Sequence, residues 1–167
     1  AWRQYLQFAD QVQQLEPDKV DWWIEQSYAH NNLGSLAITR GTPELAAPEF
    51  AASIALKERA LRRTPDSKVL IAELADSYSW LGLARQSLGE LRLAENLYQK
   101  EMALVLRLRA QFPDEPLWVK RQIQALQHRA AIALALGHDE IALADYTAAK
   151  EFFLRISGQD QTNQTWQ

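Results

Sequence analysis

The residue types that carry most enzyme chemistry are scarce in this chain. There is no cysteine, and the three histidines are His30, His128 and His138. They do not show the i, i+4 spacing of a metal site on one helix, and there is no His-Glu-x-x-His motif. We interpret His138-Asp139-Glu140 as the start of a helix, where the helix dipole favours acidic side chains. We therefore predict that the chain has no metal site.

Motifs for nucleophilic catalysis, phosphate binding and calcium binding are also missing. The six glycines are scattered singly, whereas a phosphate-binding loop needs them clustered. The sequence contains no Gly-x-Ser-x-Gly elbow and no stretch of about twelve residues with the alternating oxygen ligands of a calcium loop. We predict that the chain is not an enzyme and that it has no catalytic residue and no cofactor.

The composition is that of a globular protein. Among 167 residues, 47% are hydrophobic and 23% are charged, which argues against a disordered chain. The net charge of −3 disfavours a nucleic-acid partner. One basic patch, made of Arg59, Arg62, Arg63 and Lys68, lacks interleaved aromatic residues, and we interpret it as a solvated edge.

No segment is predicted to cross a membrane or to direct secretion. The most apolar run, Met102–Leu108, contains Arg107 and is far shorter than the ~20 residues that a bilayer requires. Residues 1–4 show no apolar core of a signal peptide. We expect a cytoplasmic protein without a membrane partner. Because Met102 is the only methionine, we also expect that the start has been processed or cut from a longer chain.

The sequence favours helices that repeat every 48 residues. Stretches rich in Ala, Leu, Gln, Glu and Arg lie between sparse glycines and prolines, and no strand pattern is present. Five sets of similar residues recur at this one offset without a gap. These sets are Pro17-Asp18, Pro65-Asp66 and Pro113-Asp114; Gly34, Gly82 and Ala130; Gly41, Gly89 and Gly137; Ala46, Ala94 and Ala142; and Phe50, Tyr98 and Tyr146.

Each set has a structural role. Proline ends one helix, and the Asp after it is expected to cap the next. Gly41 and its equivalents suit a turn with positive φ between two helices. The small residues let two helices approach closely, and the aromatic residue fills the space beside that contact. Each unit is therefore predicted to be a hairpin of two antiparallel helices, each of roughly 20 residues.

A helical hairpin cannot bury its apolar face alone, so we predict an all-α solenoid of about seven helices. The expected layout is the second helix of a preceding repeat (1–16), three repeats (17–64, 65–112 and 113–160), and the start of a following repeat or a frayed tail (161–167). We expect one continuous domain cut from a longer array. Its uncovered apolar ends predict self-association. We also expect Ala94 to lie where two helices touch.

These residues resemble the tetratricopeptide repeat family. Its signature places Leu-Gly in the first helix, then Ala, then an aromatic residue. Leu33-Gly34, Ala46 and Phe50 match this order, as do the equivalent residues of the second unit, whereas the third unit has Arg129-Ala130 in place of Leu-Gly. The family repeat of about 34 residues is shorter than this one. Lengthened units of this kind are similar to those of multidomain bacterial signalling proteins.

The resemblance implies a right-handed superhelix whose first helices line a concave, protein-binding face. The family's groove positions, together with Trp80 and His128 beside them, are Tyr28, Asn31, Ser35, Asp76, Ser79, Trp80, Leu83, Gln86, Gln124, Gln127, His128 and Ala131. One subfamily clamps a peptide's terminal carboxylate with basic residues. Here Asn31 and His128 stand at two of those positions, so we predict that this clamp is absent.

Two hypotheses for the function follow. The first is a non-catalytic scaffold that binds a peptide or a partner protein on its concave face. The alternative is an internal regulatory or spacer segment of a larger signalling protein, such as a kinase or a transcription regulator.

Two further sets at the same offset concern charge and tryptophan. Arg59, Arg107 and Arg155 are interpreted as members of salt bridges or as solvated charges, with binding of phosphate or of an acidic partner as the alternative. Trp22, Leu70 and Trp118 are predicted to be core residues between helices. Trp80 is a candidate anchor for a ligand in the groove.

Overall fold

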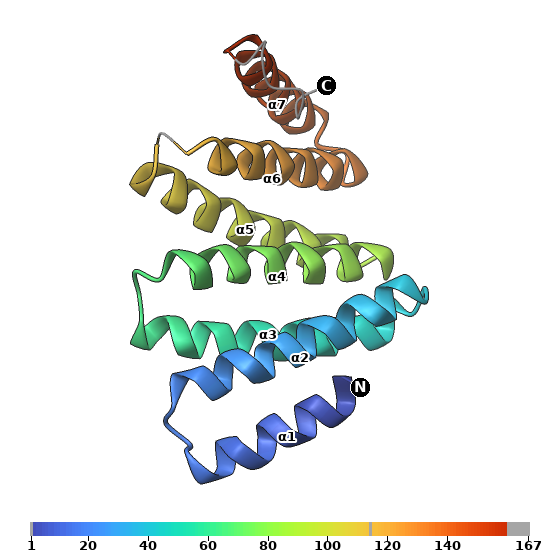
Figure 1. Cartoon of the computed structure of the whole chain (residues 1–167). Helices are drawn as coiled ribbons and strands as arrows, with labels where there is room; N and C mark the ends of the chain where they lie inside the picture. Colours follow the sequence, from blue (N-terminus) through green and yellow to red (C-terminus); the bar gives the residue numbers. More distant parts are fainter. Residues whose placement is uncertain (1, 114, 160–167) are drawn as a thin grey trace.

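The computed structural model describes residues 2–113 and 115–159, which form seven α-helices and no strand (Figure 1). The helices are α1 (Trp2–Leu15), α2 (Val20–Thr39), α3 (Pro43–Arg63), α4 (Lys68–Ser87), α5 (Leu91–Gln111), α6 (Pro116–Ala135) and α7 (Asp139–Gln159). Each helix packs against the next one in the chain, and α1 and α7 lie at opposite ends of the stack (Figure 1). The predicted all-α solenoid is confirmed. Residues 161–167, expected to begin another repeat or to fray, lie outside the described residues.

The helices recur with the same 48-residue period as the repeated residues of the sequence. Helices α2, α4 and α6 begin at positions 20, 68 and 116, and α3, α5 and α7 begin at 43, 91 and 139. The glycines between the paired helices, Gly41, Gly89 and Gly137, have φ angles of +70°, +76° and +77°. The prediction of turns with positive φ is therefore confirmed, because glycine alone enters this region without a steric penalty. Within the described ranges, no helix is apolar enough over a sufficient length to span a bilayer.

A glycine and an aromatic residue hold each of the first two hairpins together. A Cβ atom added to Gly34 would lie 2.8 Å from the ring of Phe50, and one added to Gly82 would lie 2.6 Å from the ring of Tyr98. Both distances are shorter than any van der Waals contact. Phe50 and Tyr98 are buried as a result, and the small residue of each first helix allows the close approach that the sequence predicted.

The third hairpin departs from this arrangement. Ala130 takes the place of the glycine and is fully buried, while Tyr146, in the aromatic position, is 43% exposed. The Cβ atom of Ala130 occupies space that the glycines leave to the ring. Tyr146 also lies on α7, the last helix of the described chain, where no following helix covers it.

The Asp residues of the first two Pro-Asp pairs do not cap helices as predicted, and Asp114 of the third pair lies outside the described residues. The residue that caps α4 is Ser67, whose hydroxyl oxygen accepts a hydrogen bond from the amide of Leu70 at 3.4 Å. The corresponding residue before α2 is Lys19, which makes no side-chain cap. Asp66 is exposed and pairs with Arg107 instead. At these two pairs the prediction was wrong because the turn after the proline is one residue longer than a direct Pro-Asp cap requires.

The prediction that Trp22, Leu70 and Trp118 are core residues is confirmed at two of the three positions. Leu70 and Trp118 are buried, but Trp22 is only half-buried, and its neighbour Trp23 enters the core beside Leu70. The Trp22 indole N–H donates to Glu16 Oε2 at 2.7 Å, at the junction of α1 and α2. This polar contact keeps Trp22 at the surface while Trp23 supplies the buried ring.

The three arginines of the ladder have different partners. Arg107 donates to the carbonyl oxygen of Pro65 at 2.6 Å and to Asp66 at 3.3 Å, which agrees with the salt-bridge interpretation. The guanidinium of Arg59 lies 3.8 Å from the ring centre of Trp23, and that of Arg155 lies 5.7 Å from Phe152. Two of the three side chains therefore cover aromatic rings.

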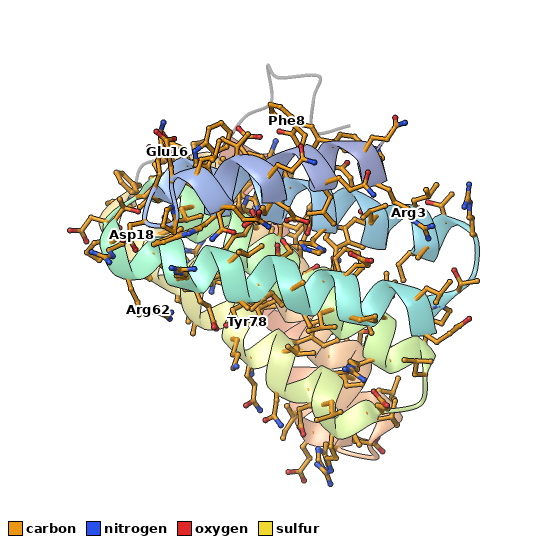
Figure 2. All side chains as sticks on the ribbon, turned by 90° about the horizontal axis from the view of Figure 1, so that it is seen from below. Arg3, Phe8, Glu16, Asp18, Arg62 and Tyr78 are labelled. Atoms are coloured by element: carbon orange, nitrogen blue, oxygen red, sulfur yellow. The ribbon has the colours of Figure 1, made fainter. Side chains whose placement is uncertain are left out.

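The α1 end of the molecule is more exposed than its middle. Viewed from the α1 end, Phe8 lies at the outer edge, whereas Tyr78 lies inside the stack (Figure 2). Arg62 of the basic patch is exposed at the edge in the same view. Another member of that patch, Lys68, is bonded to Glu115 at 2.6 Å. The patch is thus partly neutralised by neighbouring acids.

Candidate functional site

The first helices of the hairpins contact one another directly, and this shared side forms the inner face of the stack. Besides its sequence neighbours, α4 touches both α2 and α6. The Tyr28 hydroxyl on α2 donates to Glu73 Oε1 on α4 at 2.9 Å. One repeat further on, Arg121 on α6 donates to Asp76 on α4. Both pairs join residues 45 positions apart, so the same inner-face contact recurs with different chemistry.

A buried polar group supports the first of these contacts. Lys57 on α3 is 2% exposed, and its Nζ donates to Ser77 Oγ at 2.9 Å. Ser77 Oγ lies 3.2 Å from Asn31 Oδ1 and completes the link between α2 and α4. Burial lowers the pKa of the Lys57 ammonium. Burial and the Glu73 carboxylate raise the pKa of Tyr28 to about 12. Tyr28 and Asn31 therefore join helices in this structure.

The inner face is hollowed between α4 and α6, with α5 behind them. This cavity, which we call the α4–α6 groove, has a volume of about 390 Å³. Its lining residues are Asp76, Ser79, Trp80, Leu83 and Gln86 of α4, Tyr98 and Glu101 of α5, and Arg121, Gln124, His128 and Ala131 of α6.

Aromatic rings form one wall of the groove. Trp80 is 37% exposed and stacks on Phe50, with ring centres 6.0 Å apart and planes 12° apart. His128 occupies the equivalent position in the next repeat and stacks on Tyr98 at 5.1 Å. The Tyr98 hydroxyl donates to Gln86 Oε1 at 3.0 Å. Burial, and then the nearby Glu101 carboxylate, raises the pKa of Tyr98, so this hydroxyl stays protonated.

The ionisable side chains of the groove are bonded to one another. Arg121 pairs with Asp76 at one end. Glu101, which is buried, accepts a hydrogen bond from His128 Nδ1 at 2.9 Å. By contrast, the side chains of Ser79, Trp80 and Gln124 form no hydrogen bond with any described residue. The lining side chains without a bonded partner among the described residues are thus neutral, whereas the charged ones are paired.

The structure brings together many, but not all, of the residues assigned from the sequence. Those that line the groove are Asp76, Ser79, Trp80, Leu83, Gln86, Gln124, His128 and Ala131. Tyr28, Asn31, Ser35 and Gln127 lie outside it. The first two are engaged in the contacts between α2 and α4.

Three lining residues were missed by the sequence analysis: Tyr98, Glu101 and Arg121. Tyr98 was assigned to the helix contact, and its second role at the groove was overlooked. The pairing of Asp76 with Arg121 could have been predicted from the sequence. The two opposite charges are 45 positions apart, which is about one helical turn less than the 48-residue repeat. Nothing in the sequence distinguishes Glu101 from a solvated acidic residue.

The described residues offer no further chemical site. They contain no cluster of three or more His, Asp or Glu side chains that could hold a metal ion. Lys57 and Ser77 have the residue types of a nucleophile and its base, but both side chains are buried, so a substrate would have no access to them.

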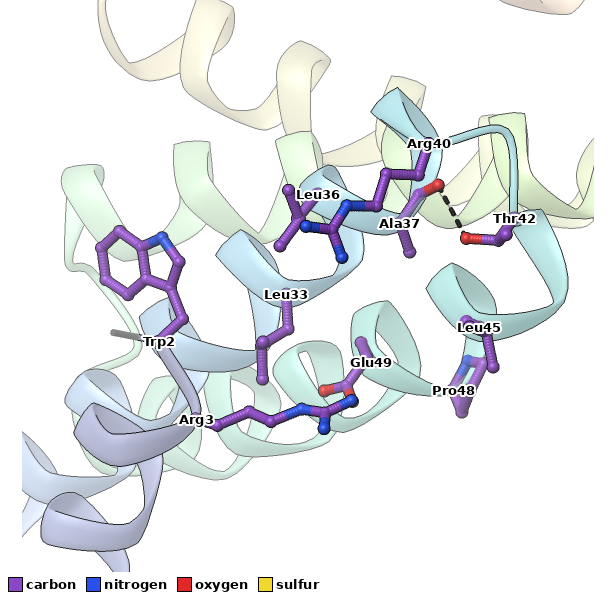
Figure 3. Close-up of a pocket in the computed structure, with 10 residues that line it drawn as sticks. All are labelled: Trp2, Arg3, Leu33, Leu36, Ala37, Arg40, Thr42, Leu45, Pro48 and Glu49. Carbon is purple, nitrogen blue, oxygen red and sulfur yellow. Dashed lines mark hydrogen bonds between the residues drawn. The ribbon is translucent and has the colours of Figure 1, made fainter.

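A second cavity lies at the α1 end, between α1, α2 and α3. Its volume is about 750 Å³. Trp2 and Arg3 of α1, Leu33, Leu36, Ala37 and Arg40 of α2, Thr42, and Leu45, Pro48 and Glu49 of α3 surround it (Figure 3). Within it, the Thr42 hydroxyl donates to the carbonyl oxygen of Ala37 at 3.0 Å. Six of its ten lining residues are apolar, so we call it the apolar cavity; Arg3, Arg40 and Glu49 are its charged lining residues.

Comparisons with known proteins add no argument to what the structure itself shows. No family model matches the chain, and no curated protein matches it. Among solved structures, the chain is similar to the one described as the crystal structure of MamA, with 15% sequence identity and a TM-score of 0.30. That alignment covers 92% of this chain and 89% of that chain.

Proposed function

We propose that this chain is a tetratricopeptide-type interaction module that holds a peptide segment of a protein partner in the α4–α6 groove. The observation that carries the proposal is that eight residues assigned from the sequence to a binding face surround one cavity. An exposed tryptophan face and unbonded polar side chains lie together in that cavity.

The groove has the physical features of a binding surface. Trp80 offers a large apolar face that is held in place by Phe50 behind it, and tryptophan is among the residues that contribute most to binding at interfaces. The pair Asp76–Arg121 joins α4 to α6, and the pair Glu101–His128 joins α5 behind the groove to α6. A groove that is formed before the ligand arrives loses less entropy on binding.

A selection experiment with matched variants tests the proposal. Linear peptides displayed on phage are selected against the chain, resynthesised, and measured by fluorescence polarisation. Trp80→Ala should weaken binding by about tenfold or more, the effect of removing an interface hot spot. Trp2→Ala is the matched control, because it removes an exposed tryptophan that lines the other cavity.

Because Trp80 also stacks on Phe50, a second variant keeps the test independent of folding. Gln124 is exposed, so Gln124→Trp should leave the melting temperature unchanged while it fills the groove and blocks binding. Selected peptides that bind wild type, Trp80→Ala and Gln124→Trp equally would contradict the proposal.

A further inference from the structure

The ion pairs and hydrogen bonds among the side chains that line the groove indicate what kind of peptide it binds. This inference rests on the function proposed above. A charged ligand group needs an opposite charge that is free to meet it. In the groove, the guanidinium of Arg121 is already bonded to Asp76, and the buried carboxylate of Glu101 is bonded to His128. The Nε atom of Arg121 is buried and not open to the groove. A charged ligand group would have to break an existing pair or lose water without compensation.

Among the described residues, the lining side chains that have no ion-pair partner are neutral. Ser79, Gln124 and the amide nitrogen of Gln86 can each bond to a backbone N–H or C=O group of a ligand. Leu83 and Trp80 supply exposed apolar surface between these polar groups. An extended peptide backbone with one apolar side chain matches this set of groups.

The length of the groove sets the length of the ligand. Its residues on α4 run from Asp76 to Gln86, which corresponds to about 15 Å along a helix. An extended chain advances ~3.3 Å per residue, so about four or five residues fill this length.

We propose that the α4–α6 groove binds an uncharged, internal stretch of four or five extended residues. The groove holds the stretch through its backbone amides and through one apolar side chain that packs on Trp80 and Leu83. A charged side chain or a peptide's C-terminal carboxylate is not the recognised feature. The partner is accordingly a protein that exposes such a segment within its chain.

Three measurements on the selected peptides test this assignment. The dissociation constant should change by less than about twofold between low salt and ~0.5 M salt, because no charge of the ligand is recognised. A peptide with a C-terminal amide should bind within about twofold of the free acid. Replacing its apolar anchor by Lys or Glu should weaken binding by about tenfold or more.

Two variants test which side chains form hydrogen bonds with the peptide backbone. Gln124→Ala combined with Ser79→Ala should weaken binding about tenfold, as expected when two hydrogen bonds to a ligand are lost. Gln127→Ala is the matched control on the same helix, because Gln127 is exposed and lies outside the groove. Its affinity should equal that of the wild type.

The outcomes separate this inference from the proposed function. Peptides that are lost in Trp80→Ala but weaken tenfold with salt, or that need a free carboxylate, would overturn the inference and leave the function standing. A selection that yields no peptide sensitive to Trp80→Ala would overturn both.

Discussion

The surface that α3 covers on α4 and the surface that the described residues leave uncovered on α2 are formed by equivalent residues, 48 positions apart. On α4, Leu81 and Ala84 are buried against Ala46, Ala47 and Phe50 of α3. On α2, the equivalents Leu33 and Leu36 line the apolar cavity, and Leu36 is 38% exposed. The same pattern thus gives a core in one place and an open surface in the other.

Among the described residues, the extent of the neighbouring helix explains this difference. Helix α3 begins at Pro43, two turns before Phe50, and those two turns cover α4. The described part of α1 begins at Trp2, which is the equivalent of Phe50, so the positions equivalent to 43–49 of α3 lie outside the described residues. Phe50 is fully buried, whereas Trp2 is 42% exposed. In a stack of hairpins, the burial of a residue therefore depends on the helix beside it as much as on its own position in the repeat.

The largest expected effect comes from removing the two equivalent aromatic residues. Phe50→Ala should lower the free energy of unfolding by about 3–5 kcal/mol, because it leaves a cavity in the core. Trp2→Ala should lower it by less than about 1 kcal/mol, because the ring is largely solvated. Urea unfolding followed by circular dichroism measures both values. Equal losses would show that the two surfaces do not differ as described.

Overpacking a closed contact should have the next largest effect. Ala94 is fully buried beside Tyr98 and Ile132, so Ala94→Leu should cost about 1–3 kcal/mol. Ala103 on the same helix is exposed, and Ala103→Leu serves as the control with little expected change. A thermal melt of both variants checks the prediction, and an unchanged melting temperature for Ala94→Leu would mean that this helix contact is misplaced.

The uncovered surface on α2 should be covered when α1 is extended by a copy of the α3 segment that covers the equivalent surface on α4. Residues 43–48 of α3, placed directly before Ala1, would extend α1 by nearly two turns in the register of α3. Covering the apolar cavity should stabilise the protein by about 1–2 kcal/mol, given ~25 cal/mol per Å² of apolar surface buried. The same extension with glutamates in place of its two alanines is the control. If both extensions give the same urea midpoint, the comparison between α1 and α3 fails.

The smallest expected effect concerns a buried charge at the closed junction. Lys57 on α3 is equivalent, at the 48-residue offset, to Ala9 on α1 and Val105 on α5, which are both buried and apolar. Lys57→Met should therefore stabilise the protein by about 1 kcal/mol near pH 7, because it removes a desolvated ammonium.

This gain should depend on pH. Burial holds the pKa of Lys57 below its unfolded value, so the unfolded chain binds more protons and wild-type stability rises with pH in the window between those two values. The advantage of Lys57→Met should consequently shrink as the pH rises through that window. Urea unfolding of both proteins at neutral and alkaline pH measures this, and an advantage that grows with pH would contradict it.

The features of the fold that depend on neighbouring residues were predictable from the sequence. The glycines at the turns, the helix lengths and the contact of Gly34 with Phe50 all follow from local rules on φ angles, helix propensity and side-chain size. The polar residues of the groove were located in part because the resemblance to the tetratricopeptide repeat family implies which positions of the first helices line a binding face. The Asp caps were wrong because the cap depends on how the chain bends between two helices.

What the sequence by itself determined is the repeating unit, because a period of 48 residues records the same contact made several times. Only the tertiary structure decided which equivalent positions are covered: Trp23 and not Trp22 in the core, Tyr146 exposed, and Glu101 and Arg121 brought into the groove. The physical reason is that burial and charge pairing arise between helices that are distant in sequence. A pattern within one helix does not contain the length, the tilt or the side chains of the helix that packs against it.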